Sequence, residues 1–398
     1  MAIEANSYNI GCDDSEKMLH VCKSITMVSQ QRIFFDFLQF CISSVADIPA
    51  SVKDADWKVL YVIAKKQALI GVLFYGIRRL PKELAPEQKL LMQWMVMAEQ
   101  IRKQNIRLFQ DSVKVCQNFE NEGFANCILK GQGNALLYPD PYMRTPGDID
   151  IYLAGGRKRV MQYINKVCPN QVMRYHHVDF PVMKTAIEAH FTPSYMFCPI
   201  HNRRMQKWFE EVMGEQCNHR VSLPDGYGEI HVPQVSFNVI YILSHLYRHV
   251  FTEGIGLRQL LDYYFVVMMW HTDLTNLTDS DSADLAALQR ELKRLGLWKF
   301  AGAVMYVLHE VFGLEEDMMI VPMNEKEGMF LLDGIMRGGN FGQYDDRLGD
   351  KTGEGKVHRY FRMSLRNMRF VKHYSSEALC EPLFRTWFWT WKKLNVTK

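Results

Sequence analysis

The hydrophobic positions change their spacing twice along the chain. Up to about residue 125 they recur every three or four residues, which is the spacing of amphipathic helices. It predicts helices from Ser15 to Ser44, from Trp57 to Leu80, and over a long stretch that ends near Asn121. Gly123 is placed to cap the last of them. From Val235 onward the helical spacing returns, so two helical regions flank a middle segment with a different pattern.

The middle segment carries the period of two that is typical of short strands. One strand ends at Leu129 and a second covers Asp148 to Leu153. After them the pattern predicts a helix from Arg157 to Val167, strands over Gln171–Val182 and Lys184–Phe191, and a helix from His201 to Gly214. Helices are predicted in the C-terminal region at Val235–Phe251, Leu257–Trp270, Ser282–Leu295, Trp298–Val311, Glu325–Met336, Val357–Tyr374 and Glu377–Leu394.

These elements predict an α+β (mixed α/β) fold, in which a small mixed sheet is flanked by N-terminal and C-terminal helical segments. We expect an N-terminal helical region over residues 1–125, an α/β core over 126–232, and a C-terminal helical domain over 233–398. A chain of 398 residues is long enough to bury a core of this size.

Composition narrows the class of protein. The chain is 48% hydrophobic and 23% charged, and its net charge of +3 gives little attraction to nucleic acid. Its nine cysteines are scattered and form no Cys-x-x-Cys pair, which favours a reducing compartment over a disulfide framework. The N-terminus lacks a signal-peptide pattern, and no apolar run reaches the roughly 20 residues of a membrane span. We therefore expect a cytoplasmic protein with no membrane partner.

The candidate chemistry centres on the strand Asp148-Ile149-Asp150-Ile151. Because side chains alternate along a strand, Asp148 and Asp150 share one face while the two isoleucines point into the core. Two carboxylates side by side at the mouth of a strand repel each other unless a cation lies between them. Magnesium prefers oxygen ligands, so the pattern predicts a metal site at this strand.

The wider motif resembles a known family. Leu129-Lys130-Gly131 is followed by Tyr138-Pro139, Arg144 and Gly147-Asp148-Ile149-Asp150, in an order similar to the bacterial uncharacterised nucleotidyltransferases of the DNA polymerase beta-like superfamily. The resemblance implies the fold of this superfamily. It also implies a magnesium-dependent transfer of a nucleoside monophosphate from a nucleoside triphosphate. It also implies a third carboxylate on a neighbouring strand.

Two glutamates compete for the place of the third carboxylate. Glu188 lies on an alternating run about forty residues after the aspartates, and Glu188-Ala189-His190 resembles the Glu-x-His of the family. Glu229 has the same form in Glu229-Ile230-His231 but falls nearer the C-terminal helices. Glu188 is therefore preferred, with Asp148 and Asp150, as a catalytic and metal-binding residue.

Other residues are candidates for nucleotide binding. Gly131 and Gly133 would let the backbone approach phosphate oxygens, and Lys130 and Arg144 would contact phosphates or organise the site. The superfamily usually has Gly-Ser or Gly-Gly at this turn, so Gln132 is a departure that puts its mode of phosphate binding in doubt.

Several histidines are candidates for the same site. The resemblance extends through His245, His249, Arg258 and Asp262, which would line the cleft or support it, as would His190. The i, i+4 spacing of His245 and His249 also suits zinc, although the chain lacks the glutamate of a His-Glu-x-x-His motif. His176 and His177 occupy adjacent strand positions, so opposite faces are predicted for their side chains.

Two C-terminal features have simple interpretations and sharper alternatives. Four arginines recur at helical spacing and form one stripe, namely Arg359, Arg362, Arg366 and Arg369. The stripe predicts a solvated basic face, or alternatively a surface that binds a polyanion or the acceptor. Five aromatic residues cluster near the C-terminus, namely Phe384, Trp387, Phe388, Trp389 and Trp391. The cluster predicts part of a hydrophobic core or of an interface. The alternative is a membrane-surface anchor beside Lys392 and Lys393.

Three functions remain open on the sequence alone. The first is a nucleotidyltransferase that uses Mg²⁺ or Mn²⁺ and a nucleoside triphosphate donor, with a small molecule or protein favoured over nucleic acid as acceptor. The second is a catalytically inactive nucleotide- or partner-binding module of the same fold. The third is an Asp-x-Asp glycosyltransferase, which the helical first 125 residues argue against. Only the first function explains why the Lys-Gly, Arg and Asp-x-Asp motifs occur together and in this order.

Overall fold

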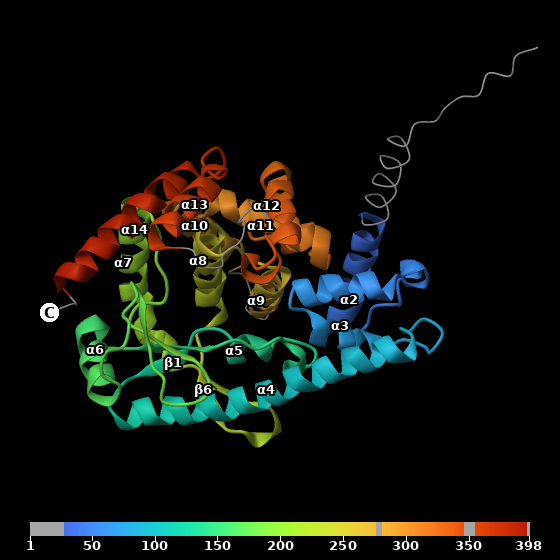
Figure 1. Ribbon diagram of the computed structural model, residues 1–398, viewed down its shortest axis with the longest axis horizontal. Coiled ribbons are helices and arrows are strands. Elements are labelled where there is room, and N and C mark those ends of the chain that lie inside the picture. Colours follow the sequence, from blue (N-terminus) through green and yellow to red (C-terminus); the bar gives the residue numbers. More distant parts are fainter. Residues whose placement is uncertain (1–27, 276–280, 346–354, 396–398) are drawn as a thin grey trace, which may run out of the picture.

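The structure is a computed structural model that describes residues 28–275, 281–345 and 355–395. Within them the protein has an α+β fold, with one small mixed sheet flanked by helices from both ends of the chain (Figure 1). This confirms the fold class predicted from the sequence. The first part of the predicted helix Ser15–Ser44 lies outside the described residues, and the described part is helical over residues 28–42.

Strands β1 to β4 form the main sheet of the described residues, in the order β1-β2-β4-β3. Their bounds are β1 (Asn126–Ile128), β2 (Ile149–Leu153), β3 (His177–Asp179) and β4 (Ile187–His190). β2 runs antiparallel to β1 and parallel to β4, and β3 runs antiparallel to β4. The parallel pair needs a long crossover, which passes through α6 (Gly156–Val167) and β3. β2 and β4 are therefore the central strands.

Helices that precede the sheet pack beside and beneath it. They are η1 (Ala50–Asp54), α2 (Trp57–Lys66), α3 (Ile70–Ile77) and the 34-residue α4 (Gln88–Asn121), which runs under the sheet along the base of the molecule (Figure 1). The predicted helix Trp57–Leu80 is in fact two helices. Ala68 adopts a left-handed conformation, with φ of 57°, which ends the first helix and redirects the chain into the second.

The remaining elements, several of them short, complete the chain. They are α5 (Gln132–Ala135), η2 (Pro141–Met143), α7 (Pro199–Gln216), β5 (Arg220–Ser222), η3 (Pro224–Gly226), β6 (Glu229–His231), α8 (Val235–Thr252), α9 (Leu257–Thr275), α10 (Asp281–Arg294), α11 (Trp298–Phe312), η4 (Glu316–Met318), α12 (Glu325–Gly338), η5 (Asn340–Gly342), α13 (Lys356–Met368) and α14 (Ser375–Asn395). The β5–β6 hairpin, a separate two-stranded sheet, was not predicted.

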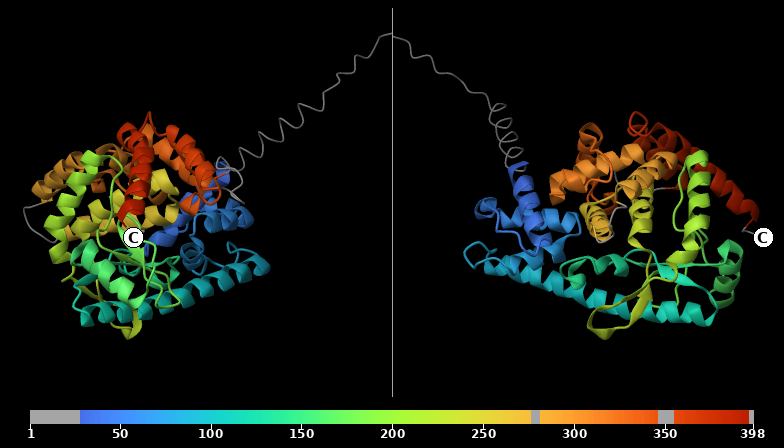
Figure 2. Two further views of the ribbon diagram at one scale, coloured as in Figure 1. Left: turned by 60° about the vertical axis from the view of Figure 1, so that its left-hand side comes forward. Right: turned by 180° about the vertical axis from the view of Figure 1, so that it is seen from behind.

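Two clusters of buried side chains hold these layers together. The larger joins the N-terminal helices to the C-terminal ones and includes Phe34, Trp94, Tyr241 and Phe300. The smaller lies between the sheet, α4 and α6. In Figure 2 the C-terminal helices lie against the sheet layer in both views. Helices from the two ends of the chain thus share one core above the sheet. Among the described helices, none has the length and apolar character needed to cross a membrane.

The strands β3 and β4 are shorter than the alternating runs that predicted them. Before β3 the chain turns back on itself, because Arg174 N–H donates to the His177 carbonyl at 2.8 Å and Met173 forms an isolated bridge with Val178. The predicted strand Gln171–Val182 is therefore a tight turn followed by three strand residues. This turn also changes where the adjacent histidines point.

Candidate active site

Strand β2 carries two aspartates to the mouth of the sheet. Asp148 stands just before the strand and Asp150 is its second residue. Ile149 and Ile151 have no exposed surface, so the predicted alternation of this strand is confirmed. Asp150 is only 3% exposed and Asp148 is half-buried. The two carboxylates therefore lie on the side of β2 away from these isoleucines.

Glu188 lies directly beside Asp150. The strands β2 and β4 are parallel with Asp150 opposite Glu188, and residues in register point to the same face. Both carboxylates contact one ring nitrogen, since His190 Nε2 is 3.0 Å from Asp150 Oδ1 and 3.4 Å from Glu188 Oε2. Glu229 lies instead on the exposed β5–β6 hairpin, 3.8 Å from Arg220. The fold thus brings Glu188, and not Glu229, to the aspartates.

Two neighbours stabilise the buried charge of Asp150. Lys130 Nζ lies 3.1 Å from Oδ2, and His190 Nε2 contacts Oδ1. Burial by itself would raise the pKa of Asp150, but Lys130 and His190 hold that pKa well below its ordinary value. Burial would likewise lower the pKa of His190, and its hydrogen bonds to Asp150 and Glu188 raise it instead. Asp150 is therefore ionised at neutral pH, as a metal ligand must be.

Asp148 has the opposite electrostatic environment. The charge of Asp150, followed by burial and the charge of Glu188, raises the pKa of Asp148 to about 6, and Lys130 offsets only part of this. Carboxylates that repel one another in this way favour a cation between them. The negative charges around Asp148 are therefore only partly compensated by nearby cations.

The donor set fits magnesium. Mg²⁺ takes oxygen ligands and keeps several waters, so two or three carboxylates suffice. Asp150, Glu188 and His190 each place one ligand atom within 4.8 Å of the others, and Asp148 repels the same carboxylates. Asp148, Asp150 and Glu188 are the residues that would hold the ion.

Replacing Asp148 with asparagine is expected to stabilise the metal-free protein at pH 7. The pKa of an aspartate in an unfolded chain is about 3.9, so the folded protein binds this proton more tightly. Stability therefore falls as pH rises from about 4 to about 6, and above that window the ionised Asp148 destabilises the fold by up to about 3 kcal/mol. Urea unfolding without divalent cations should show the gain at pH 7 and none at pH 4. The same gain at both pH values would contradict this explanation.

A cleft of about 690 Å³ opens in front of the carboxylates. Lys130, Asp148 and Glu188 line it from the sheet, and residues of α8 and of the C-terminal elements line it from the other side. Its cationic side chains are Lys130, Arg174, Arg248 and Arg258, and its aromatic ones include Tyr175, Tyr195, Phe341 and Phe388. A volume of this order accommodates a nucleotide-sized ligand, and the cations suit a polyanion.

The histidines of α8 face cations, not a zinc site. His245 Nε2 is 2.9 Å from Lys130 Nζ, and Arg248 Nη2 is 3.0 Å from His249 Nε2. Burial and the charge of Lys130 lower the pKa of His245, and burial and Arg248 lower the pKa of His249 to about 4. As neutral acceptors these rings hold Lys130 and Arg248 in the cleft. Zn²⁺ at the same nitrogens would compete with those cations, so the i, i+4 pair does not fit zinc.

His176 and His177 both line the cleft, which corrects the prediction that they face opposite sides. His176 precedes the strand in the turn that starts at Arg174, so strand alternation does not apply to it. His177 Nδ1 is 3.3 Å from His176 Nε2 and 3.2 Å from Glu188 Oε2. Burial, followed by the charge of His190, lowers the pKa of His177 to about 2, so its ring is neutral.

Arg144 supports the site from behind the cleft. Its Nε and Nη2 donate to Asp262 Oδ1 and Oδ2 at 2.8 and 2.7 Å, and both side chains are buried. The Tyr138 hydroxyl donates to the same carboxylate at 2.7 Å. This ion pair ties the loop before β2 to α9, which favours the site-organising role of Arg144 over phosphate contact. Arg258, which lines the cleft and donates to the Thr145 carbonyl at 3.0 Å, is the arginine of this region that a ligand can reach.

The glycine turn after β1 positions Lys130 but does not itself line the cleft. Gly131 has φ of +65°, which glycine adopts readily. A Cβ at Gly133 would lie 2.8 Å from Val232 Cγ1, so this glycine permits close packing. Gln132 is 2% exposed and lies in the short α5. Phosphate binding by these three backbone groups stays a prediction.

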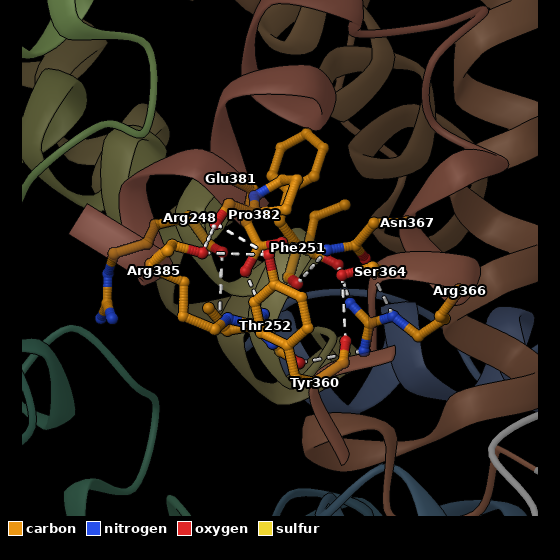
Figure 3. A network of polar contacts seen from close by, with 12 residues as sticks. Arg248, Phe251, Thr252, Tyr360, Ser364, Arg366, Asn367, Glu381, Pro382 and Arg385 are labelled. Atoms are coloured by element: carbon orange, nitrogen blue, oxygen red, sulfur yellow. Dashed lines mark hydrogen bonds and ion pairs between the residues drawn. The ribbon is translucent and has the colours of Figure 1, made fainter. Parts of the chain in front are cut away.

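Helix α13 fixes the end of α8, which carries the cleft residues Arg248 and His249 (Figure 3). Arg366 donates to the carbonyls of Val250 and Thr252 at 2.6 and 3.0 Å. Asn367 donates to the Phe251 carbonyl at 2.8 Å. These bonds satisfy carbonyls that the last turn of a helix leaves without partners.

The predicted solvated basic stripe is therefore wrong for two of its arginines. Arg366 is 9% exposed, and Arg369 lies 4.0 Å from Asp345. The side chain of Arg359 lies outside the described residues. Helical spacing alone gave no sign that this basic stripe, and not the apolar one, packs against α8.

Sequence reasoning missed several lining residues. Arg174, Arg248, Tyr195, Phe341 and Phe388 reach the cleft from separate elements. Arg248 had a signal, because it stands between two histidines already assigned to the site. Phe388 belongs to the aromatic cluster, which predicted core or interface and not this cleft. The other three lie in segments without motif character, so nothing in the sequence identified them.

The chain matches a known protein family over most of its length. The model of a family described as "Uncharacterised nucleotidyltransferase" matches residues 53–313. No curated protein matches the chain. One similar solved structure is an antigenic nucleotidyltransferase-like protein from Paracoccidioides brasiliensis, with 13% identity and a TM-score of 0.28, covering 48% of this chain and 92% of that one. The family match spans all the carboxylates and cations of the cleft, and the chain belongs to this uncharacterised nucleotidyltransferase family.

Proposed function

We propose that this protein transfers a nucleoside monophosphate from a nucleoside triphosphate to an acceptor hydroxyl, with Mg²⁺, or Mn²⁺ in its place, as cofactor. The observation that carries the proposal is the convergence of Asp148, Asp150 and Glu188 at one edge of the sheet, where Asp148 and Glu188 line a cationic cleft and Asp150 lies beside Glu188. Membership of the nucleotidyltransferase family supports the same reaction class.

Each side chain of the cleft has a role in this reaction. The bound ion would neutralise charge on the phosphates and the attacking oxygen. Lys130, Arg248 and Arg258 bind and orient the triphosphate, because their charges face the cleft beside the carboxylates. His190 holds the Asp150 carboxylate in place through a hydrogen bond of 3.0 Å. Arg144 positions the strand that carries the aspartates. The acceptor enters the same cleft, with a small molecule or protein favoured over nucleic acid.

Metal-dependent nucleotide binding tests the proposal. Each of the four ribonucleoside triphosphates is titrated calorimetrically into the wild type and into Asp148→Asn/Asp150→Asn, with and without Mg²⁺. Binding that requires the ion and is lost in the double variant is expected, and thermal unfolding shows that the variant is folded. Binding that survives in the double variant would contradict the proposed site. Binding without release of pyrophosphate, whatever hydroxyl acceptor is added, would favour an inactive binding module.

Substitution of the two competing glutamates should give opposite results. Glu188→Gln is expected to weaken magnesium-dependent triphosphate binding by about tenfold, or ~1.4 kcal/mol, because it removes a carboxylate beside Asp150. Glu229→Gln should leave binding unchanged, because Glu229 is exposed on the separate hairpin. The matched substitutions are compared in the same calorimetric titration. An equal loss in both variants would contradict the assignment of Glu188.

A further inference from the structure

The C-terminal helices α13 and α14 expose an unusual number of large apolar side chains. We call six of them the C-terminal apolar surface: Phe361, Leu365 and Met368 on α13, and Leu379, Leu383 and Trp387 on α14. Each is more than half exposed to solvent. The three residues on α14 are spaced four apart, so they form a single stripe along that helix.

Two hollows join these residues into one surface. The first, of about 200 Å³, lies between the two helices and is lined by Phe361, Leu365, Met368 and Leu379. The second, of about 410 Å³, is lined by Leu383 and Trp387 together with residues of α7. Leu379 and Leu383 are about one helical turn apart, so the hollows adjoin. Isolated exposed apolar residues are normal, but a contiguous group of this kind marks an interaction site.

The same pair of helices is strongly basic. Residues 356–395 contain nine lysines and arginines but two acidic residues, Glu377 and Glu381, which gives a formal charge of +7. Three of these cations are engaged within the fold, because Arg366 is buried and Arg369 and Arg385 contact Asp345 and Glu381. Both glutamates are 1% exposed and bonded internally. Glu377 accepts from the Phe197 and Cys198 N–H groups, and Glu381 accepts from Asn367. In the described part of this helix pair, neither carboxylate faces the solvent around the apolar surface. Lys372 is exposed and directly follows Val371, which lines the first hollow.

We propose that the C-terminal apolar surface docks on an anionic lipid membrane. Apolar side chains flanked by cations suit a bilayer surface, because the apolar groups enter the acyl boundary while the cations contact anionic headgroups. This proposal replaces the expectation of no membrane partner, and it is independent of the proposed catalytic function. The hollow beside α7 shares Tyr175 with the active-site cleft, so a docked membrane lies next to that cleft.

Two other occupants fit the surface less well. Binding of single-stranded nucleic acid depends on aromatic rings that stack on bases, whereas four of the six exposed residues are Leu or Met. A second copy in a two-fold interface would bring two equally basic surfaces together. Complementary charge therefore favours the lipid surface.

Vesicle sedimentation tests the proposal with the full-length protein. We expect binding to vesicles that contain phosphatidylglycerol and none to vesicles of phosphatidylcholine alone. Leu365→Glu/Leu383→Glu should weaken binding by at least about tenfold, and Lys372→Gln by roughly fivefold. Val62→Glu is the matched control, because Val62 is 62% exposed on α2 at the opposite end of the molecule from α14 (Figure 2). All of these positions are exposed, so the variants should keep the thermal unfolding temperature of the wild type.

Four results would overturn the proposal. They are failure to bind anionic vesicles, equal binding to neutral vesicles, binding unaffected by the double substitution, and a loss in Val62→Glu as large as that in the double variant. Binding of single-stranded RNA that the double variant loses, in place of vesicle binding, would assign the surface to nucleic acid. A wild-type dimer in sedimentation velocity that the double variant converts to monomer would assign it to a second copy of the chain.

Discussion

Asp150→Asn is expected to reduce nucleotidyl transfer by about a thousandfold while leaving the protein folded. Asp150 is the buried carboxylate that Lys130 and His190 keep ionised. Asparagine keeps the shape and can still accept from His190, but it removes the charge that would bind the metal in the proposed reaction. A loss of about 4 kcal/mol of transition-state stabilisation corresponds to this reduction in rate. The rate is measured as metal-dependent release of pyrophosphate.

Asp179→Asn is the matched control for this change. Asp179 is a half-buried aspartate of β3 that pairs with Glu188 in the sheet, and His177 Nε2 is 4.0 Å from its carboxylate. It does not line the cleft, so activity should stay within a few-fold of the wild type. A similar loss in both variants, or a rate in Asp150→Asn within tenfold of the wild type, would contradict the role given to Asp150.

Arg144→Met is expected to lower the free energy of unfolding by about 3–5 kcal/mol. The substitution leaves the buried Asp262 with one hydrogen bond, from the Tyr138 hydroxyl, and with the charge of Arg258, which lowers its pKa less than Arg144 does. Removing one member of a buried ion pair has this effect because the other charge loses its compensation. Burial opposes the ionisation of Asp262, whereas Arg144 lowers its pKa, so the pair is charged in the folded protein. Urea unfolding at pH 7 measures the change.

Two further variants distinguish the effect of breaking a buried ion pair from the effect of losing any arginine. Arg337→Met removes an exposed pair with Asp333 at 2.9 Å and should change stability by less than about 1 kcal/mol. Arg144→Met/Asp262→Leu removes both buried charges and should recover part of the stability lost in the single variant. A double variant less stable than Arg144→Met alone would show that the buried charge is not the cause.

The local part of the candidate site could be predicted from the sequence. Alternation along Asp148 to Leu153 placed two isoleucines in the core and two aspartates on the other side, because a strand has a fixed period of two. The spacing to Glu188 suggested a neighbouring strand, and the parallel register of β2 and β4 places Glu188 opposite Asp150. Each of these inferences depends on residues close in sequence or on one strand pairing.

The parts that depend on distant contacts could not be predicted. Arg144 meets Asp262 across 118 positions, and Arg366 meets Val250 across 116, so no local pattern shows that either arginine is buried. His176 left the strand pattern because a turn precedes β3, held by the Arg174–His177 backbone hydrogen bond and the Met173–Val178 bridge. The one predicted helix over residues 57–80 failed at Ala68, where the backbone takes a left-handed conformation that alanine seldom adopts.

The most direct test of the active site is to locate the metal ion. Crystals grown with Mn²⁺ and a non-hydrolysable nucleoside triphosphate would show the ion by its anomalous scattering. We predict a peak coordinated by Asp148, Asp150 and Glu188, with the triphosphate beside Lys130, Arg248 and Arg258. An ion bound elsewhere, or a triphosphate bound in the cleft with no ion at these carboxylates, would contradict the proposed site.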